Sequence, residues 1–335
     1  MPAGDLTVRQ LTAAFERRWI ASNYNDPMPR AAALLCVLAL VLTGCTTAGT
    51  TSLAPLQTVP LQSAQSTSTM TPAPSASITK VLVFVEENHS LSEMKTGMPY
   101  TFSLAQRFGY ATNYTAITHP SLPNYVAIAG GQSYGITDDA DPSAHPLAGK
   151  SVFGQAIANG KTAMVFAEGM PANCATTNGG SSYAVKHNSW AYFTAERGLC
   201  QKYDVPIDRL DAAVAGGNLP NVGMVIPNLC NDAHDCPLST ADAWFQGWMT
   251  KIFAGPDWNS GHLAVILTAD EDDKSAKNTV LTVAIHPSQS ANVVTSPLTH
   301  YSLTRFLEDV SGSPYLVNAR TAPSMTKAFG LPLLP

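Results

Sequence analysis

The chain has 335 residues, of which 45% are hydrophobic and 13% are charged, and its formal net charge at pH 7 is −5. This apolar fraction is enough for a sizeable buried core, and the charge balance is not acidic enough to indicate a disordered chain. No run of lysine or arginine stands out, so the composition argues against a nucleic-acid partner.

Residues 28–45, "MPRAAALLCVLALVLTGC", predict an export signal. One arginine precedes an apolar run that is too short to span a bilayer comfortably. The ending resembles a bacterial lipobox, in which the cysteine, here Cys45, becomes the lipidated first residue of the mature protein. The alternatives are an ordinary cleaved signal and a retained membrane anchor. Residues 1–27 are then an extension before the true start.

Residues 46–78 are rich in Ser, Thr, Pro and Ala and almost uncharged. Such a segment cannot bury enough apolar surface to fold, so we expect a disordered tether. A catalytic domain of residues 79–335 would follow it. The predicted location is the outer face of the cell membrane, as a lipoprotein, or the extracellular medium.

Five apolar, β-branched runs in this domain end abruptly at polar residues, at 81–85, 162–167, 222–226, 262–269 and 279–285. Continuous apolar runs are typical of strands in a sheet that is covered on both faces. Helical patterns lie between them, at 101–109, 151–160, 207–217, 240–255 and 300–312. The alternation predicts an α/β domain with a mainly parallel central sheet and helices on both faces.

The segment "THPSLPNY", residues 118–125, has a serine between two prolines. Pro120 and Pro123 restrict the backbone around Ser121, and the residues that follow predict a short helix ending near Gly131. Ser121 would stand just before the helix N-terminus, where free N–H groups favour negative charge. The alternative is a proline-flanked turn with the serine as its cap.

Four cysteines lie in the predicted domain, and an export signal implies an oxidising compartment. Cys230 and Cys236 close a small loop and are the easiest pair, so Cys174 and Cys200 pair by elimination. The alternative is a cysteine-based zinc site, but no CxxC spacing supports it.

Polar side chains directly follow three predicted strands: Glu87 and Asn88, His234, and Asp270 and Glu271. In such sheets, sites form just beyond the carboxyl ends of the strands. Carboxylate and amide oxygens suit Mg²⁺, Ca²⁺ or Mn²⁺, and adjacent carboxylates repel each other unless a cation lies between them. Taken alone, the "DEDD" segment is also compatible with a solvated acidic turn.

A metal ion touching Ser121 would lower the pKa of its hydroxyl and provide a nucleophile. Asn124 would donate to one oxygen of a bound anion. Histidines would donate to others or protonate the leaving oxygen, and the candidates are His119, His234 and His300. Together these groups suit a phosphate. The alternatives are that His119 only orients its proline turn and His300 only begins its helix.

The sequence assigns no role to His187, and the remaining histidines are expected to be structural: His89, His145, His262 and His286. Imidazolium donors are populated below about pH 6.5, so the histidine-rich site predicts operation at acid pH.

Seven segments occur in this order: "EENHS", "THPSLPNY", "KHNSW", "IPNLCNDAHDC", "DAWF", "TADEDD" and "HYSLTRFLED". Over roughly residues 79–333 they resemble the bacterial phosphoesterase family of acid phosphatases and non-haemolytic phospholipases C, within the alkaline phosphatase superfamily. The likeness points to secreted actinobacterial acid phosphatases, some regarded as phosphatidylinositol 3-phosphate phosphatases. It implies an alkaline-phosphatase-like fold.

The resemblance also implies residue roles. The metal ligands that it implies are Glu87, Asn88, Ser121, Asp270 and Glu271, with Ser121 as the nucleophile. The groups that it implies around the phosphate are His119, His234, His300 and, more weakly, Asp232. The implied reaction is in-line attack by the serine, a phosphoseryl intermediate and hydrolysis by water. The metal would be Mg, Ca, Mn or Zn.

Two positions depart from the family pattern, because Ser189 stands where relatives usually have Pro and Ala269 where they usually have Trp. Both would alter the shape of the pocket. The extra C-terminal domains of the larger phospholipases C are absent, which favours a phosphomonoesterase over a phosphodiesterase. A non-catalytic surface lipoprotein would be expected to lack the nucleophile or a ligand, and all are present. The expected partners are a phosphate ester and, through the lipid anchor, a membrane.

Overall fold

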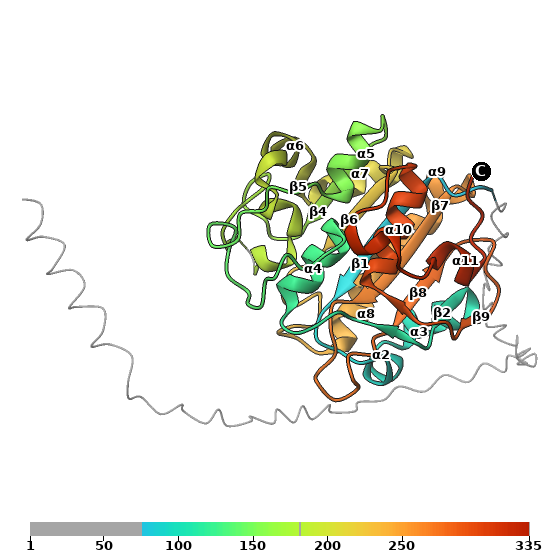
Figure 1. Cartoon of the computed structure of the whole chain (residues 1–335). Coiled ribbons are helices and arrows are strands. Elements are labelled where there is room, and N and C mark those ends of the chain that lie inside the picture. The colour runs from blue at the N-terminus through green and yellow to red at the C-terminus, as the bar shows by residue number, and fades with distance from the viewer. Residues whose placement is uncertain (1–75, 181, 335) are drawn as a thin grey trace, which may run out of the picture. The chain divides into compact units, whose positions relative to one another are not determined.

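The computed structural model describes residues 76–180 and 182–334 (Figure 1). The predicted extension (1–27), the export signal with Cys45 and most of the predicted tether lie outside the described residues. The folded region begins slightly before residue 79, because Ile78 is buried and forms a parallel β-bridge with Leu333.

The helices and strands follow one another in alternation along the chain. The strands are β1 (Lys80–Glu86), β2 (Gly109–Ala111), β3 (Tyr114–Thr115), β4 (Ala163–Ala167), β5 (Asp204–Pro206), β6 (Val222–Ile226), β7 (Leu263–Ala269), β8 (Thr282–Ile285), β9 (Asn292–Val294) and β10 (Leu298–Thr299). The α-helices are α2 (Leu91–Gly97), α3 (Pro99–Arg107), α4 (Ser121–Gly130), α5 (Val152–Ala158), α6 (Arg197–Tyr203), α7 (Asp208–Gly216), α8 (Leu238–Ala254), α9 (Pro256–Asn259), α10 (His300–Ser311) and α11 (Met325–Phe329). The 3₁₀ helices are η1 (Val185–His187), η2 (Ser189–Tyr192), η3 (Thr194–Glu196) and η4 (Val317–Arg320).

Eight strands form the central sheet in the order β5-β4-β6-β1-β7-β8-β2-β9. The first five of this order run parallel to one another, whereas β8 is antiparallel to β7 and to β2. The loop between β7 and β8 contains no crossover helix, and a parallel neighbour would need one. The predicted α/β class with a mainly parallel sheet is confirmed, and all five predicted strands are present.

Helices cover both faces of the sheet. On one face α4, α5 and α10 pack together, and on the other α8 packs against α2, α3, α7 and α9 (Figure 1). Side chains of β1 alternate between these layers. Phe84 makes edge-to-face contacts with Trp244 and Phe245 of α8, whereas Glu87, just past the strand, meets Tyr125 of α4. Two covered faces explain the continuous apolar runs of the central strands.

Both predicted disulfides are present. Cys174–Cys200 joins the loop after β4 to α6, and Cys230–Cys236 closes the loop after β6. Within the described ranges, no helix is both long and apolar enough to cross a membrane.

Candidate active site

Ser121 is the first residue of α4, with Pro120 as the extended residue before it. The sequence predicts that the helix starts after Ser121. In the structure the helix includes this serine. Pro123 is compatible with this position because the first turn of a helix has no internal acceptors for its N–H groups. The N–H of Leu122 donates to Asp139 Oδ1 at 2.9 Å. Ser121 is almost fully buried, at 2% exposure.

The hydroxyl of Ser121 lies between a carboxylate and an ammonium group. It donates to Glu87 Oε2 at 3.0 Å, and it accepts from Lys186 Nζ at 3.3 Å. The other oxygen of Glu87 accepts from the hydroxyl of Tyr125 at 2.6 Å. Tyr125 lies one helical turn after Ser121, so both reach the end of β1 from the same face of α4.

His187 lies between two carboxylates. Its Nε2 is 3.2 Å from Glu87 Oε2, its Nδ1 is 3.2 Å from Asp232 Oδ2, and its ring stacks on Tyr125. Burial opposes the charged ring, but Glu87 and Asp232 outweigh burial and raise the pKa of His187 to about 10. Burial likewise opposes ionisation of Glu87, but His187 and the hydrogen bond from Tyr125 lower its pKa to about 2. Glu87 and His187 therefore form a buried ion pair.

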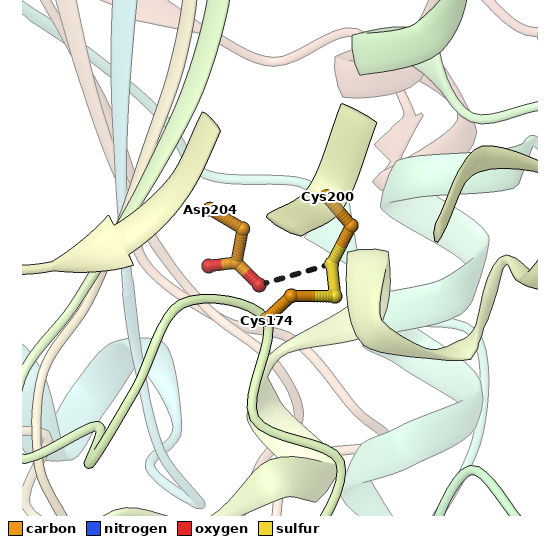
Figure 2. A group of neighbouring side chains, drawn as sticks. All are labelled: Cys174, Cys200 and Asp204. Atoms are coloured by element: carbon orange, nitrogen blue, oxygen red, sulfur yellow. Dashed lines mark hydrogen bonds between the residues drawn. A yellow bond between two sulfur atoms is a disulfide. The ribbon is translucent and has the colours of Figure 1, made fainter. Parts of the chain in front are cut away.

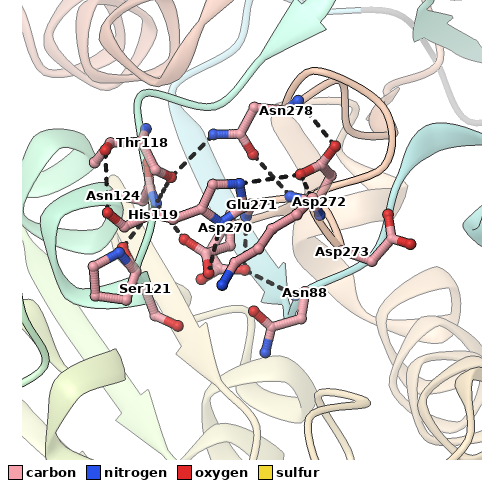
Figure 3. Close-up of polar contacts among 12 residues, drawn as sticks. Asn88, Thr118, His119, Ser121, Asn124, Asp270, Glu271, Asp272, Asp273 and Asn278 are labelled. Atoms are coloured by element: carbon pink, nitrogen blue, oxygen red, sulfur yellow. Dashed lines mark hydrogen bonds and ion pairs between the residues drawn. The ribbon is translucent and has the colours of Figure 1, made fainter.

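Asp270 joins the two acidic strand ends (Figure 3). Its Oδ1 accepts the backbone N–H groups of Asn88 at 3.0 Å and Glu271 at 2.7 Å. The two strands are neighbours, since β1 pairs with β7 along its whole length. Burial, together with the charges of Glu87 and Glu271, raises the pKa of Asp270 well above its usual range. Its Oδ2 is buried with no hydrogen-bond partner among the described residues.

Glu271 is held by His119, just before α4, and by Asn124 in the first turn of α4 (Figure 3). His119 Nδ1 lies 3.1 Å from Glu271 Oε1, and Asn124 Nδ2 donates to Glu271 Oε2 at 3.0 Å. The other ring nitrogen of His119 is 3.1 Å from Asp272 Oδ1. Asn124 Oδ1 also accepts the N–H of Thr118 at 3.2 Å. Asn124 thus fixes the turn that presents the serine, and it does so with both ends of its amide.

His234 lies at the more exposed side of the site. Its Nδ1 is 2.7 Å from Asp235 Oδ1, and its Nε2 is 3.3 Å from Lys186 Nζ. A carboxylate only accepts and an ammonium only donates, so these contacts fit a neutral ring with its proton on Nδ1. Asp232 Oδ1 accepts the N–H of His234 at 2.8 Å, so Asp232 supports both this histidine and His187.

His300 supports the site from behind. It is fully buried, its Nε2 is 2.6 Å from the carbonyl oxygen of Asp270, and its Nδ1 is 3.1 Å from the hydroxyl of Tyr114. Burial lowers the pKa of His300 to about 4. With both nitrogens engaged and the ring neutral, this geometry does not suit the predicted role of an imidazolium donor to phosphate. The alternative, that His300 begins its helix, agrees with the start of α10.

The arrangement fits a divalent cation. Glu87, His187 and Asp232 each bring one ligand atom within 4.8 Å of the others, and a cation bound by His187 would have to displace a ring proton, because an imidazolium has no free lone pair. Asp270 Oδ2 is buried without a hydrogen-bond partner in the described chain. Hard oxygen donors of this kind prefer Mg²⁺, Ca²⁺ or Mn²⁺, and a histidine also suits zinc. The predicted ligand pairs meet here, since Ser121 contacts Glu87 and the Asn88 backbone contacts Asp270.

The central sheet and the helices on its two faces form an α/β fold of the alkaline-phosphatase type. Two solved structures share this fold: the lipoteichoic acid synthase LtaP of Listeria monocytogenes, with a TM-score of 0.52 and 8% identity, covering 74% of this chain and 77% of that one, and an alkaline phosphatase superfamily protein of Vibrio parahaemolyticus, with a TM-score of 0.51 and 11% identity, covering 72% and 68%. The model of the Phosphoesterase family matches residues 83–312. The chain belongs to that family, and it is a hydrolase that acts on phosphoric ester bonds.

Relatives of known name agree with this class. The chain is 31% identical over 256 residues to a phosphatidylinositol-3-phosphatase of Mycobacterium tuberculosis, which covers 75% of this chain and 82% of the relative. It is 28% identical over 220 residues to a phosphate-repressible acid phosphatase of Penicillium chrysogenum, covering 61% of this chain. The chain spans about half of that fungal relative, 52% of its length.

The sequence analysis does not predict three residues of the site, namely Tyr125, Lys186 and Asp139. Tyr125 could have been found, because its i, i+4 spacing from Ser121 places both on one helix face. Lys186 and Asp139 lie outside the regular strands and α-helices. In such segments no hydrophobic periodicity indicates which way a side chain points. His187, which the sequence leaves without a role, contacts Glu87.

Proposed function

We propose that the protein is an exported phosphomonoesterase that uses Ser121 as its nucleophile. The observation that carries the proposal is the position of the Ser121 hydroxyl. It stands at the first residue of α4, between Glu87 Oε2 at 3.0 Å and Lys186 Nζ at 3.3 Å. A helix N-terminus and an ammonium group favour a phosphate at this oxygen, and the carboxylate is the nearest acceptor for its proton.

The reaction would run in two displacements. The oxygen of Ser121 attacks phosphorus, its proton passes to Glu87, and the bond from phosphorus to the leaving oxygen breaks. His234, at the more exposed side, delivers a proton to the leaving oxygen when its ring is in the imidazolium form, with a proton on Nε2 as well as Nδ1, and His119 is the second candidate donor. Water then attacks the phosphoseryl group and gives one proton back to His234. The bond from phosphorus to Ser121 Oγ breaks, the proton held by Glu87 returns to Ser121, and inorganic phosphate leaves.

The residues that would hold a divalent metal ion are Glu87, Asn88, Ser121, Asp270 and Glu271, with His187 and Asp232 adjoining them. Such an ion, when bound, would neutralise these carboxylates and lower the pKa of the serine hydroxyl. Metal analysis of the purified protein, with activity measured before and after chelation, tests this assignment. Full activity in protein stripped of all metal would contradict it.

Ser121→Ala tests the nucleophile. We expect kcat on p-nitrophenyl phosphate to fall by at least about 10³-fold, because the attacking atom is lost. Ser143→Ala, at an exposed serine of the loop after α4, is the matched control and should retain activity. Unchanged phosphatase activity in Ser121→Ala would refute the mechanism. Wild-type activity on p-nitrophenyl phosphorylcholine alone would favour the phosphodiesterase alternative.

We propose a phosphoinositide as a candidate substrate, because a relative of 31% identity is named a phosphatidylinositol-3-phosphatase. The experiment is phosphate release from vesicles that contain phosphatidylinositol 3-phosphate, compared with release from a water-soluble phosphate monoester. A rate on the vesicles no higher than the rate without enzyme would remove this substrate and leave the monoesterase in place.

We also propose export with a lipid at Cys45, which rests on the lipobox-like sequence of residues 28–45. Cells expressing the full chain would be labelled with a radioactive fatty acid. Label on the wild type that is absent from Cys45→Ala supports the anchor, and equal labelling of the two refutes it.

A further inference from the structure

Lys186 has three polar neighbours at the site. Its Nζ lies 3.3 Å from Ser121 Oγ, 3.3 Å from His234 Nε2 and 3.2 Å from Asp139 Oδ2. We propose that Lys186 determines specificity: its ammonium binds a non-bridging oxygen of the phosphate and so favours dianionic monoesters over monoanionic diesters. This inference rests on the proposed function and identifies the residue that sets its substrate class.

The position of the ammonium suits this role. During the proposed reaction phosphorus becomes bonded to Ser121 Oγ, so its other oxygens lie two bonds from an atom that Lys186 already contacts. The flexible four-carbon stem of a lysine allows the short adjustment that a direct contact requires. The contact with His234 Nε2 at 3.3 Å also holds the same ammonium beside the proposed acid.

The charge of Lys186 is available to substrate, whereas the charge of His187 is not. His187 is fully enclosed between Glu87 and Asp232. Lys186 keeps 18% of its side chain exposed, and it forms an ion pair with Asp139, whose side chain is 32% exposed. Asp139 also accepts the N–H of Leu122, so it holds the ammonium beside the first turn of α4.

The selectivity follows from the charge of the two ester classes. A monoester in its dianionic form spreads two charges over three non-bridging oxygens, whereas a diester spreads one charge over two. The attraction of a fixed cation is proportional to the charge that it faces, and it is stronger in a site that is shielded from water. Removing the ammonium should therefore weaken reaction of the monoester more than reaction of the diester.

The test compares Lys186→Gln with Lys186→Arg on p-nitrophenyl phosphate and bis(p-nitrophenyl) phosphate. For Lys186→Gln, kcat/KM on the monoester should fall by about 10²- to 10³-fold, the loss expected for one preorganised donor. The fall on the diester should be at least about tenfold smaller. Lys186→Arg keeps the charge and should recover part of the preference. Lys251→Gln, at a surface lysine paired with Asp211, should change neither rate.

Binding provides a second measurement that does not require turnover of the diester. Inorganic phosphate and dimethyl phosphate would be used as competitive inhibitors, and Lys186→Gln should weaken inhibition by the first far more than by the second. Equal losses for both substrates and both inhibitors, or no loss, would overturn the inference. Full activity in Ser121→Ala would instead overturn the proposed function, so the two failures are distinguishable.

Discussion

Among the described residues, two buried clusters have the residue types of a metal site. One surrounds Glu87, with His187 and Asp232, at the carboxyl ends of the strands, and the other combines Cys174, Cys200 and Asp204 (Figure 2). In the second cluster the two sulfur atoms are joined in a disulfide, so neither is available as a thiolate ligand. By composition alone the clusters are equivalent, and only their bonding separates them.

The second cluster is internally satisfied. Both carboxyl oxygens of Asp204 accept from Asn188 Nδ2, at 3.1 and 2.9 Å, and its Oδ2 also lies 3.4 Å from Cys200 Sγ (Figure 2). A disulfide sulfur carries no proton, so a hydrogen bond there requires the proton to be on Asp204. Burial raises the pKa of Asp204 to about 8, which favours that protonated form. The first cluster differs in its surroundings, because Glu87 accepts the hydroxyl of Ser121, the proposed nucleophile, and the nearby Asp270 Oδ2 is buried without a hydrogen-bond partner among the described residues.

The largest effect on kcat is expected from a substitution beside the first cluster. Asp270→Asn replaces a proposed carboxylate ligand at the junction of the two strand ends, and we expect kcat to fall by about 10³-fold, with loss of bound metal. Asp273→Asn, at an exposed aspartate of the same acidic segment, is the control and should keep both. Steady-state kinetics and elemental analysis give the two measurements. If Asp270→Asn kept the wild-type kcat, the proposal that the first cluster, unlike the second, serves catalysis would be contradicted.

The next effect concerns the disulfide of the second cluster. Replacing Cys174 and Cys200 together with alanine opens a loop whose ends are 26 residues apart. We expect the free energy of unfolding to fall by about 3 kcal/mol, because the unfolded chain gains freedom. Below the melting temperature, kcat should stay essentially unchanged. Urea unfolding and a phosphatase assay check this, and a loss of activity in fully folded protein would show that the second cluster also serves catalysis.

The smallest effect is a change in pH dependence. The folded-state pKa of Asp204, about 8, lies above its unfolded value, so the folded state binds the proton more tightly. Its stabilising contribution is complete below about pH 4 and is lost as the pH rises towards 8. Asp204→Asn cannot ionise, so between pH 5 and 8 it should lose less stability than the wild type, by at least about 1 kcal/mol. The free energy of unfolding would be measured by urea at several pH values for the wild type and for Asp204→Asn. If both proteins showed the same change with pH, this prediction would be wrong.

The sequence predicts the central strands well, because each is a continuous apolar run that both layers of helices cover. It does not reveal the direction of β8, since an antiparallel strand buried on both faces has the same composition as a parallel one. The short strand β2 and the two edge strands, β5 and β9, are also missed. Each has only three residues, too few for a pattern, and tertiary pairing alone defines them.

Much of the candidate site can be predicted from the sequence because its residues directly follow strands. Glu87 and Asp270 each follow an apolar run directly, and neighbouring parallel strands end at the same edge of a sheet. Asp139 and Lys186 carry no such marker, because each comes from a segment whose path depends on packing elsewhere. His300 is the opposite case, a residue that the sequence predicts to be catalytic and the structure does not favour. Burial keeps its ring neutral, and its Nε2 is hydrogen-bonded to the backbone carbonyl of Asp270.

The bridge between Ile78 and Leu333 lies at the start of β1, whereas Glu87 follows the other end of that strand. Seven strand residues at about 3.3 Å each put roughly 20 Å between the two positions. A fluorescent reporter or a chromatography bead coupled at either end of the described chain would therefore be attached far from Ser121. Enzyme immobilised in this way should keep its turnover, which makes the fold a practical scaffold for a reusable catalyst.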